Sequence, residues 1–136
     1  MTEETDITVR TKLYRTESRE KVEEAVCNLF PDAEFEDERG SAGEKRDEDI
    51  EIVAEAGEKS VERLRELVDR QEINETAYEQ LHDAVLGDTL AFSLSKQPAT
   101  VGRLNFDVGG HELGALRVRI ETEDPDVFVD RLAQLP

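Results

Sequence analysis

The sequence predicts an α+β fold of two layers, a mainly antiparallel sheet with helices packed on one face. Three observations predict it. Apolar and polar residues alternate in several short segments, as they do in half-buried strands. Other segments repeat apolar residues at helical spacing. Strands that follow one another are joined by short turns, which favours antiparallel pairing. The expected order of elements is β-α-β-β-α-α-β-β-β-α.

The first half of the chain begins with a strand and a helix. Over residues 6–14 an inward set of side chains alternates with an outward one: Ile7, Val9, Thr11 and Leu13 against Thr8, Arg10, Lys12 and Tyr14. The following helix ends before Pro31, with Thr16 or Ser18 as its N-cap and Cys27 on its inward side. Strands at 33–37 and 50–54 then enclose a charged hairpin loop, 38–49.

The second half contains two helices, three strands and a last helix. The two helices start near Ser60 and Asn74, and Gly87 is expected to close the second. Strands are expected over 89–95, 101–106 and 115–122, with Leu90, Phe92 and Leu94 inward in the first of them. Asp124-Pro125 is typical of a helix start, and the apolar side of that helix comprises Val127, Phe128, Leu132 and Leu135.

Length and charge bound the possibilities further. The 136 residues predict a single domain over 6–136, with a loose acidic N-terminus over 1–5. Acidic residues number 34 against 17 basic ones, so the formal charge is −17. Disorder and mimicry of a polyanion would each account for this charge, but the regular apolar spacing and the even scatter of acids disfavour them. We interpret the acidity as adaptation to a salt-rich cytosol, where salt screens the repulsion between carboxylates and lowers its free-energy cost.

The sequence lacks the residue patterns that are typical of disulfide frameworks, catalytic sites and metal sites. One cysteine excludes an internal disulfide framework, and Cys27 is expected in the core rather than as a catalytic thiol. Neither His82 nor His111 has a second histidine or cysteine at ligand spacing, so no metal site is predicted. We expect no catalytic residues and no cofactor. A leader and a membrane-spanning run are also missing, which predicts a cytoplasmic protein without a membrane partner.

One segment interrupts the acidity. No Asp or Glu occurs from Thr89 to Phe106, although this stretch contains Lys96 and Arg103. Two explanations stay open. These residues could form an interior strand pair with a neutral loop, or they could form a functional surface, because Ser95–Thr100 is too polar for a core and an exposed loop here should carry carboxylates.

The strand phases place basic residues on the face opposite the helices. This face is expected to carry Arg10 and Lys12, Arg103 and Asn105, and Arg117 and Arg119. The second and third strands instead offer Glu34, Glu36, Glu51 and Glu55. Such segregation has two interpretations: cross-strand ion pairs, if the acidic strands lie beside the basic ones, or a surface that faces a polyanion.

Short strings along nearly the whole chain resemble one archaeal family. The most distinctive runs from Asp88 to Gln97 and continues through Ala99, Gly102 and Asn105-Phe106. The others are Val9–Thr11 with Tyr14 and Thr16-Glu17, Asn28–Ala33, Leu64–Leu67, Arg70-Gln71, Ile73, Thr76-Ala77, Leu113-Gly114 and Asp124-Pro125. Together they resemble the archaeal uncharacterised protein family (UPF) 0201.

The resemblance implies a ribosomal-protein-like α+β fold and RNA binding without catalysis, in an exosome-like RNA-processing assembly. Combined with the basic strand face, it predicts eight RNA-binding residues: Arg10, Lys12, Lys96, Gln97, Arg103, Asn105, Arg117 and Arg119. The alternative is a docking or dimerisation module without direct RNA contact. Such a module would use the Lys96–Thr100 loop or the sheet edge, for example to bind a nucleotide-kinase-like protein.

Overall fold

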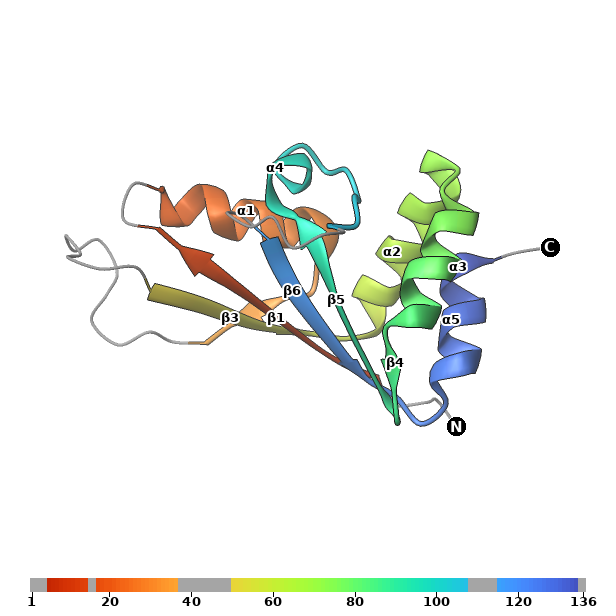
Figure 1. The fold of residues 1–136 in the computed structure, drawn as a ribbon. Coiled ribbons are helices and arrows are strands. Elements are labelled where there is room, and N and C mark those ends of the chain that lie inside the picture. The colour runs from red at the N-terminus through yellow and green to blue at the C-terminus, as the bar shows by residue number, and fades with distance from the viewer. Residues whose placement is uncertain (1–4, 15–16, 37–49, 108–114, 135–136) are drawn as a thin grey trace.

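The structure, a computed structural model, describes residues 5–14, 17–36, 50–107 and 115–134 (Figure 1). Along the chain these residues form β1 (Asp6–Leu13), α1 (Arg19–Leu29), β2 (Glu34–Phe35), β3 (Ile50–Ala56), α2 (Glu58–Gln71), α3 (Asn74–Asp83), β4 (Val85–Leu86), β5 (Thr89–Ser95), α4 (Lys96–Ala99), β6 (Ala115–Glu121) and α5 (Pro125–Ala133). The expected loop over 38–49, His111 and Leu135 lie outside the described residues.

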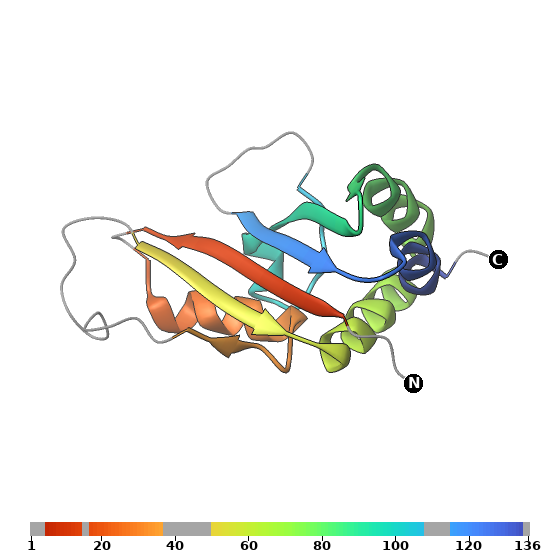
Figure 2. The same cartoon turned by 90° about the horizontal axis from the view of Figure 1, so that it is seen from below.

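The strands form one antiparallel sheet in the order β2-β3-β1-β6-β5-β4. The first strand of the chain therefore lies in the interior of the sheet, between β3 and β6. Figure 2 shows these strands in front of α1, with no helix across them on the near side. The two-layer α+β architecture predicted from the sequence is confirmed.

One face of the sheet packs against the helices and forms one side of the hydrophobic core. Alternate residues of β1, β5 and β6 are buried, as the alternation in the sequence predicted: Ile7, Val9, Leu13, Leu90, Leu94, Leu116, Val118 and Ile120. In Figure 1, α1 and α4 lie over one end of the sheet, and α2, α3 and α5 pack together at the other end. The described helices cover this face only, and outward residues on the other face, such as Arg10, Arg117 and Arg119, are exposed; we call it the open face.

Two helix starts match their sequence signals. The Ser18 hydroxyl accepts a hydrogen bond from the Lys21 N–H (3.4 Å) and caps α1. Asp124 caps α5 in the same way, through the Val127 N–H (3.3 Å), and Pro125 occupies the first turn. These local signals succeed because each cap bonds to a residue only three positions away.

The start of α2 is capped from a distant part of the chain. Gly57 has no side chain to cap the helix, and the carboxylate of Asp32 accepts hydrogen bonds from the Gly57 N–H (3.1 and 3.2 Å) and from the Ser60 hydroxyl. Partial desolvation raises the pKa of Asp32, but the hydrogen bonds from Ser60 and Gly57 outweigh it and hold this pKa below its ordinary value. The ionised carboxylate therefore stabilises the fold.

Replacing Asp32 by Ala should lower the free energy of unfolding by about 2 kcal/mol at neutral pH, since a cap is lost and the buried Ser60 hydroxyl loses its acceptor. The pKa is depressed in the folded state, so this contribution is present above the unfolded pKa of about 4 and is lost as pH falls through the folded value. Urea unfolding of both proteins at pH 7 and pH 3 measures it. Asp69→Ala, an exposed change on the same helix, should have little effect.

The expected strand over 101–106 is wrong. Residues 101–106 instead form the turns that follow the short helix α4, and Val101 is 73% exposed there. Gln71 on α2 binds the Leu104 main chain, donating to its carbonyl and accepting from its N–H at 2.8 Å each. The main-chain bonds that a strand would use are therefore partly taken by a helix side chain, and only Phe106 forms a bridge, with Leu94.

Four smaller expectations are also corrected. Gly87 does not close α3, which ends before β4; it occupies the β4–β5 turn at a φ of 66°. Cys27 is exposed rather than inward, and Val127 is 50% exposed. Partial desolvation and then the Glu23 carboxylate raise the pKa of Cys27, so its thiol stays protonated at neutral pH. Thr5, expected in a loose N-terminus, is buried.

Candidate nucleic-acid interface

Three arginines from two neighbouring strands meet on the open face of the sheet. Arg10 on β1 lies opposite Arg117 on β6, which lies opposite Ser93 on β5. In the adjoining row, Arg119 lies between Thr8 and Ala91. The small residues of β5 leave a hollow of about 430 Å³ beside the guanidinium groups. We call the site formed by Thr8, Arg10, Ala91, Ser93, Arg117 and Arg119 the arginine hollow.

Carboxylates pair with these arginines only loosely. Glu51 on β3 lies 3.4 Å from Arg10 and 3.8 Å from Arg117, and Glu121 lies 3.4 Å from Arg119. The three arginine side chains stay 53–68% exposed. The cross-strand ion pairs that one interpretation of the sequence predicted are therefore present. Exposed pairs of this length contribute little free energy and can be exchanged for another anion.

Lys12 lies two residues beyond Arg10 on the same face of β1. Its ammonium is 5.4 Å from the centre of the Tyr14 ring, a cation–π distance. Lys12 therefore extends the basic stripe of β1 and β6 toward the Leu13 end of the sheet. Tyr14 provides an aromatic ring at that end, as the strand phase predicted.

Lys96 does not belong to this surface. Its side chain is 7% exposed, and its ammonium donates to the Lys12 carbonyl (2.8 Å) and to both oxygens of Glu17 (3.1 Å each). The same ammonium lies 5.4 Å from the Tyr14 ring centre. The expectation that Lys96 occupies an exposed loop is wrong, because the turn of α4 directs it into the gap beside the end of β1.

The other predicted residues are divided between two sides of the molecule. Gln97 is exposed on α4 and, with Glu17, Ser18 and Lys21, borders a separate hollow beside α1, in the helix layer. Arg103 is exposed in the turn after α4. The Asn105 amide donates to the Ser95 hydroxyl (3.3 Å) at the end of β5, on the sheet side. The fold therefore brings together Arg10, Arg117 and Arg119, with Lys12 and Asn105 at the margin, and separates Lys96 and Gln97 from them.

The sequence prediction missed two features of this site. Ala91 and Ser93 create the hollow, and Glu51 neutralises part of it. The alternation of β5 does place Ala91 and Ser93 outward, which is a usable signal. Glu51 could not be assigned, because its contact with Arg117 depends on β1 lying between β3 and β6 with a particular register.

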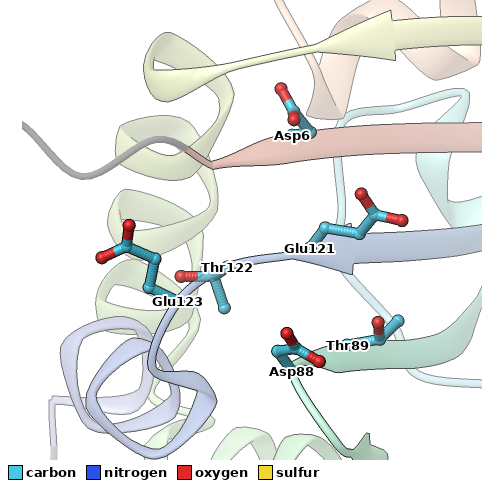
Figure 3. Close-up of a pocket in the computed structure, with 6 residues that line it drawn as sticks. All are labelled: Asp6, Asp88, Thr89, Glu121, Thr122 and Glu123. Atoms are coloured by element: carbon cyan, nitrogen blue, oxygen red, sulfur yellow. The ribbon is translucent and has the colours of Figure 1, made fainter.

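A second hollow of the open face has the opposite charge. Figure 3 shows it at the end of the interior strands, where it is lined by Asp6, Asp88, Thr89, Glu121, Thr122 and Glu123, with a volume of about 380 Å³. Among the described residues, no group of three or more His, Cys, Asp or Glu side chains is arranged to hold a metal ion. With four carboxylates around it, this hollow disfavours an anionic ligand.

Comparison with known proteins places this geometry in a family. A family model described as RNA binding matches residues 6–122. A UPF0201 protein of Thermococcus onnurineus is 34% identical over 128 residues, which cover 94% of this chain and 90% of that protein. The chain belongs to the UPF0201 family. The resemblance seen in the sequence is therefore confirmed.

Other UPF0201 relatives agree in fold and differ in length. A crystal structure of a UPF0201 protein superimposes with a TM-score of 0.81 at 32% identity, covering 96% of this chain and 94% of that one. A UPF0200/UPF0201 protein of Archaeoglobus fulgidus is 39% identical over 101 residues, which are 74% of this chain but 28% of that protein. The described residues contain no helix long and apolar enough to cross a lipid bilayer.

Proposed function

We propose that this UPF0201 protein binds RNA through the arginine hollow, with Lys12 and Asn105 contributing at its margin. The observation that carries the proposal is the meeting of three exposed arginines on adjacent strands of a chain whose formal charge is −17. Glu51 and Glu121 offset the repulsion among these arginines only in part, because the pairs are long and exposed, so a bound phosphate would lower it further. The RNA-binding description of the matching family model supports the same ligand.

The chemistry of the hollow fits a phosphate backbone. Guanidinium groups bind phosphate oxygens in a bidentate way and also stack on bases. The hydroxyls of Thr8 and Ser93 and the amide of Asn105 add short hydrogen bonds to phosphate or ribose. The site therefore offers directional contacts at close range.

Salt favours such contacts over long-range attraction. We propose that the acidity reflects a salt-rich archaeal cytoplasm. At 1 M salt the Debye length is about 3 Å, so only charges in close contact attract each other strongly. Counterion release contributes little to affinity at such concentrations. The remaining affinity is modest, and an RNA-processing assembly that holds the protein near its RNA would raise the effective concentration. The proposed role is accessory binding, with no catalytic step.

A protein-docking role is the second candidate, and it has its own observation. Leu86, the last residue of β4, is 80% exposed, and Val101, which follows α4, is 73% exposed. A large exposed apolar side chain gains free energy when a partner protein covers it. In this case Leu86→Ser or Val101→Ser would release a protein partner and leave RNA crosslinking unchanged.

Ultraviolet crosslinking to RNA at about 1 M KCl tests the proposed function, because screening removes non-specific attraction at that concentration. The proposal expects crosslinked peptides from β1 and β6, and loss of the crosslink when the arginines of β6 are reversed in charge. Crosslinks confined to the helix layer, or no crosslinks, would contradict it.

Glu51→Gln should raise RNA affinity about three-fold at low salt, because a phosphate then binds Arg10 and Arg117 without first displacing a carboxylate. The gain should vanish near 1 M salt, where the ion pairs are screened. Fluorescence anisotropy with labelled RNA measures it. Glu55→Gln removes an equal charge from the same strand without touching an arginine, so a gain of the same size there would refute the competition.

A further inference from the structure

Carboxylates border the basic stripe of the open face on three sides. On β3, the neighbour of β1, Glu55 lies opposite Thr8 and Glu51 lies opposite Lys12. Beyond the row of Thr8 and Arg119 comes the row of Asp6 and Glu121, which leads into the acidic hollow of Figure 3.

The third border lies on the far side of β5. There the N–H of Asp107 donates to the Ser93 carbonyl at 2.9 Å, so an acidic residue adjoins the strand next to β6. Toward the Leu13 end of the sheet, Glu51 lies beside Lys12 on β3, whereas the described residues on the β6 and β5 side are neutral: Ala115, Ser95 and Asn105. Among the described residues, the stripe therefore has acidic borders on three sides, and at its Leu13 end the one acidic neighbour is Glu51.

The stripe is short and narrow. From Thr8 to Lys12 the strand rises about 14 Å at about 3.4 Å per residue, and neighbouring strands are about 4.8 Å apart. A stacked nucleic-acid strand carries one phosphate per about 3.4 Å, so about four phosphates of one strand span this length. The width accommodates the phosphates of one strand above β1 and β6.

We infer that the arginine hollow accepts a short single-stranded RNA segment of about four nucleotides and excludes duplex RNA. This inference rests on the proposed function and names the form of RNA that the site selects. A single strand lies along Arg119, Arg117, Arg10 and Lys12, and its bases can turn toward the uncharged Ala91 and Ser93.

A duplex does not fit the same borders. Proteins recognise duplex RNA through phosphate and ribose contacts spread across successive grooves, over about 16 base pairs in a typical module. Here the basic side chains lie within about 14 Å of one another. A second strand would therefore place its phosphates above Glu51 and Glu55 or above Asp107. At moderate salt the Debye length is about 8 Å, so the border carboxylates repel a second strand lying above them; at about 1 M salt it is about 3 Å, and only phosphates in direct contact with them are repelled.

Fluorescence anisotropy with fluorescein-labelled dodecauridylate, alone and annealed to dodecaadenylate, tests the inference across a series of KCl concentrations. We expect the single strand to bind at least about ten-fold more tightly than the duplex. Its affinity should fall with salt at a slope of about −3 or shallower on a log–log plot, since about four phosphates contribute about 0.7 each. In a series of shorter oligouridylates, affinity should level off near four nucleotides.

The outcomes separate this inference from the proposed function. Equal or tighter binding of the duplex, a slope steeper than about −5, or affinity that keeps rising through twelve nucleotides would overturn the inference and leave RNA binding intact. Binding of neither probe would overturn both.

A variant of the borders supplies the matched control. Asp6→Asn combined with Glu55→Gln removes two border carboxylates and leaves every arginine in place. We expect this variant to gain at least about three-fold more affinity for the duplex than for the single strand. An equal gain for both probes would mean that the borders act only through net charge, which contradicts exclusion of the duplex.

Discussion

Reversing Arg117 and Arg119 together to Glu is expected to reduce affinity for single-stranded RNA by about 100-fold or more and to remove the crosslink at high salt. Each arginine–phosphate contact is a charge-assisted hydrogen bond worth about 1.5–3 kcal/mol, and each introduced carboxylate repels the phosphate it should bind. Anisotropy at low salt and crosslinking at about 1 M KCl measure the two effects.

The control for this double variant is Lys59→Glu with Arg70→Glu. Both residues lie on α2, away from the open face, and the substitution changes net charge by the same amount. We expect it to weaken low-salt binding slightly and to leave the high-salt crosslink unchanged. If both variants lose affinity equally, the arginine hollow is not the binding site. Circular dichroism and urea unfolding show whether each variant is folded.

Lys96→Ala is expected to lower the free energy of unfolding by about 2–3 kcal/mol and to leave RNA affinity of the folded protein unchanged. The substitution removes the donor that the Lys12 carbonyl and the Glu17 carboxylate share. Glu17 is 29% exposed, so water satisfies part of its carboxylate and keeps the cost in this range. Urea unfolding measures the stability, and anisotropy measures the affinity.

Gln97→Ala is the neighbouring control, since Gln97 is exposed on the same short helix. It should change the free energy of unfolding by less than about 0.5 kcal/mol. A Lys96→Ala protein that is as stable as the parent but binds RNA much more weakly would contradict the structural role of Lys96 and restore it as an RNA contact.

Much of the fold follows from patterns that act over a few residues. Alternation assigned the inward and outward faces of β1, β5 and β6 correctly, and Ser18 and Asp124 cap the helices they were expected to cap. The expected strand over 101–106 fails for the opposite reason. Its alternation is real, but Gln71 of α2, far away in the sequence, takes the main-chain groups of Leu104.

The candidate site shows the same division. Alternation alone places Arg10, Arg117 and Arg119 on the open face. It does not say that Arg10 and Arg117 are opposite each other, because the register of two strands depends on the packing of their buried residues. The contact of Glu51 with both arginines depends in turn on β3 pairing with β1.

The sequence by itself determined the α+β class, the inward and outward sets of the interior strands, and membership of the UPF0201 family, since these depend on local periodicity and on strings of residues. The tertiary structure decided which charges are neighbours. Strand order joined three arginines into one hollow bordered by acids, and the turn of α4 buried Lys96 against Glu17. Charges far apart along the chain acquire partners only when the buried faces of their strands and helices pack together.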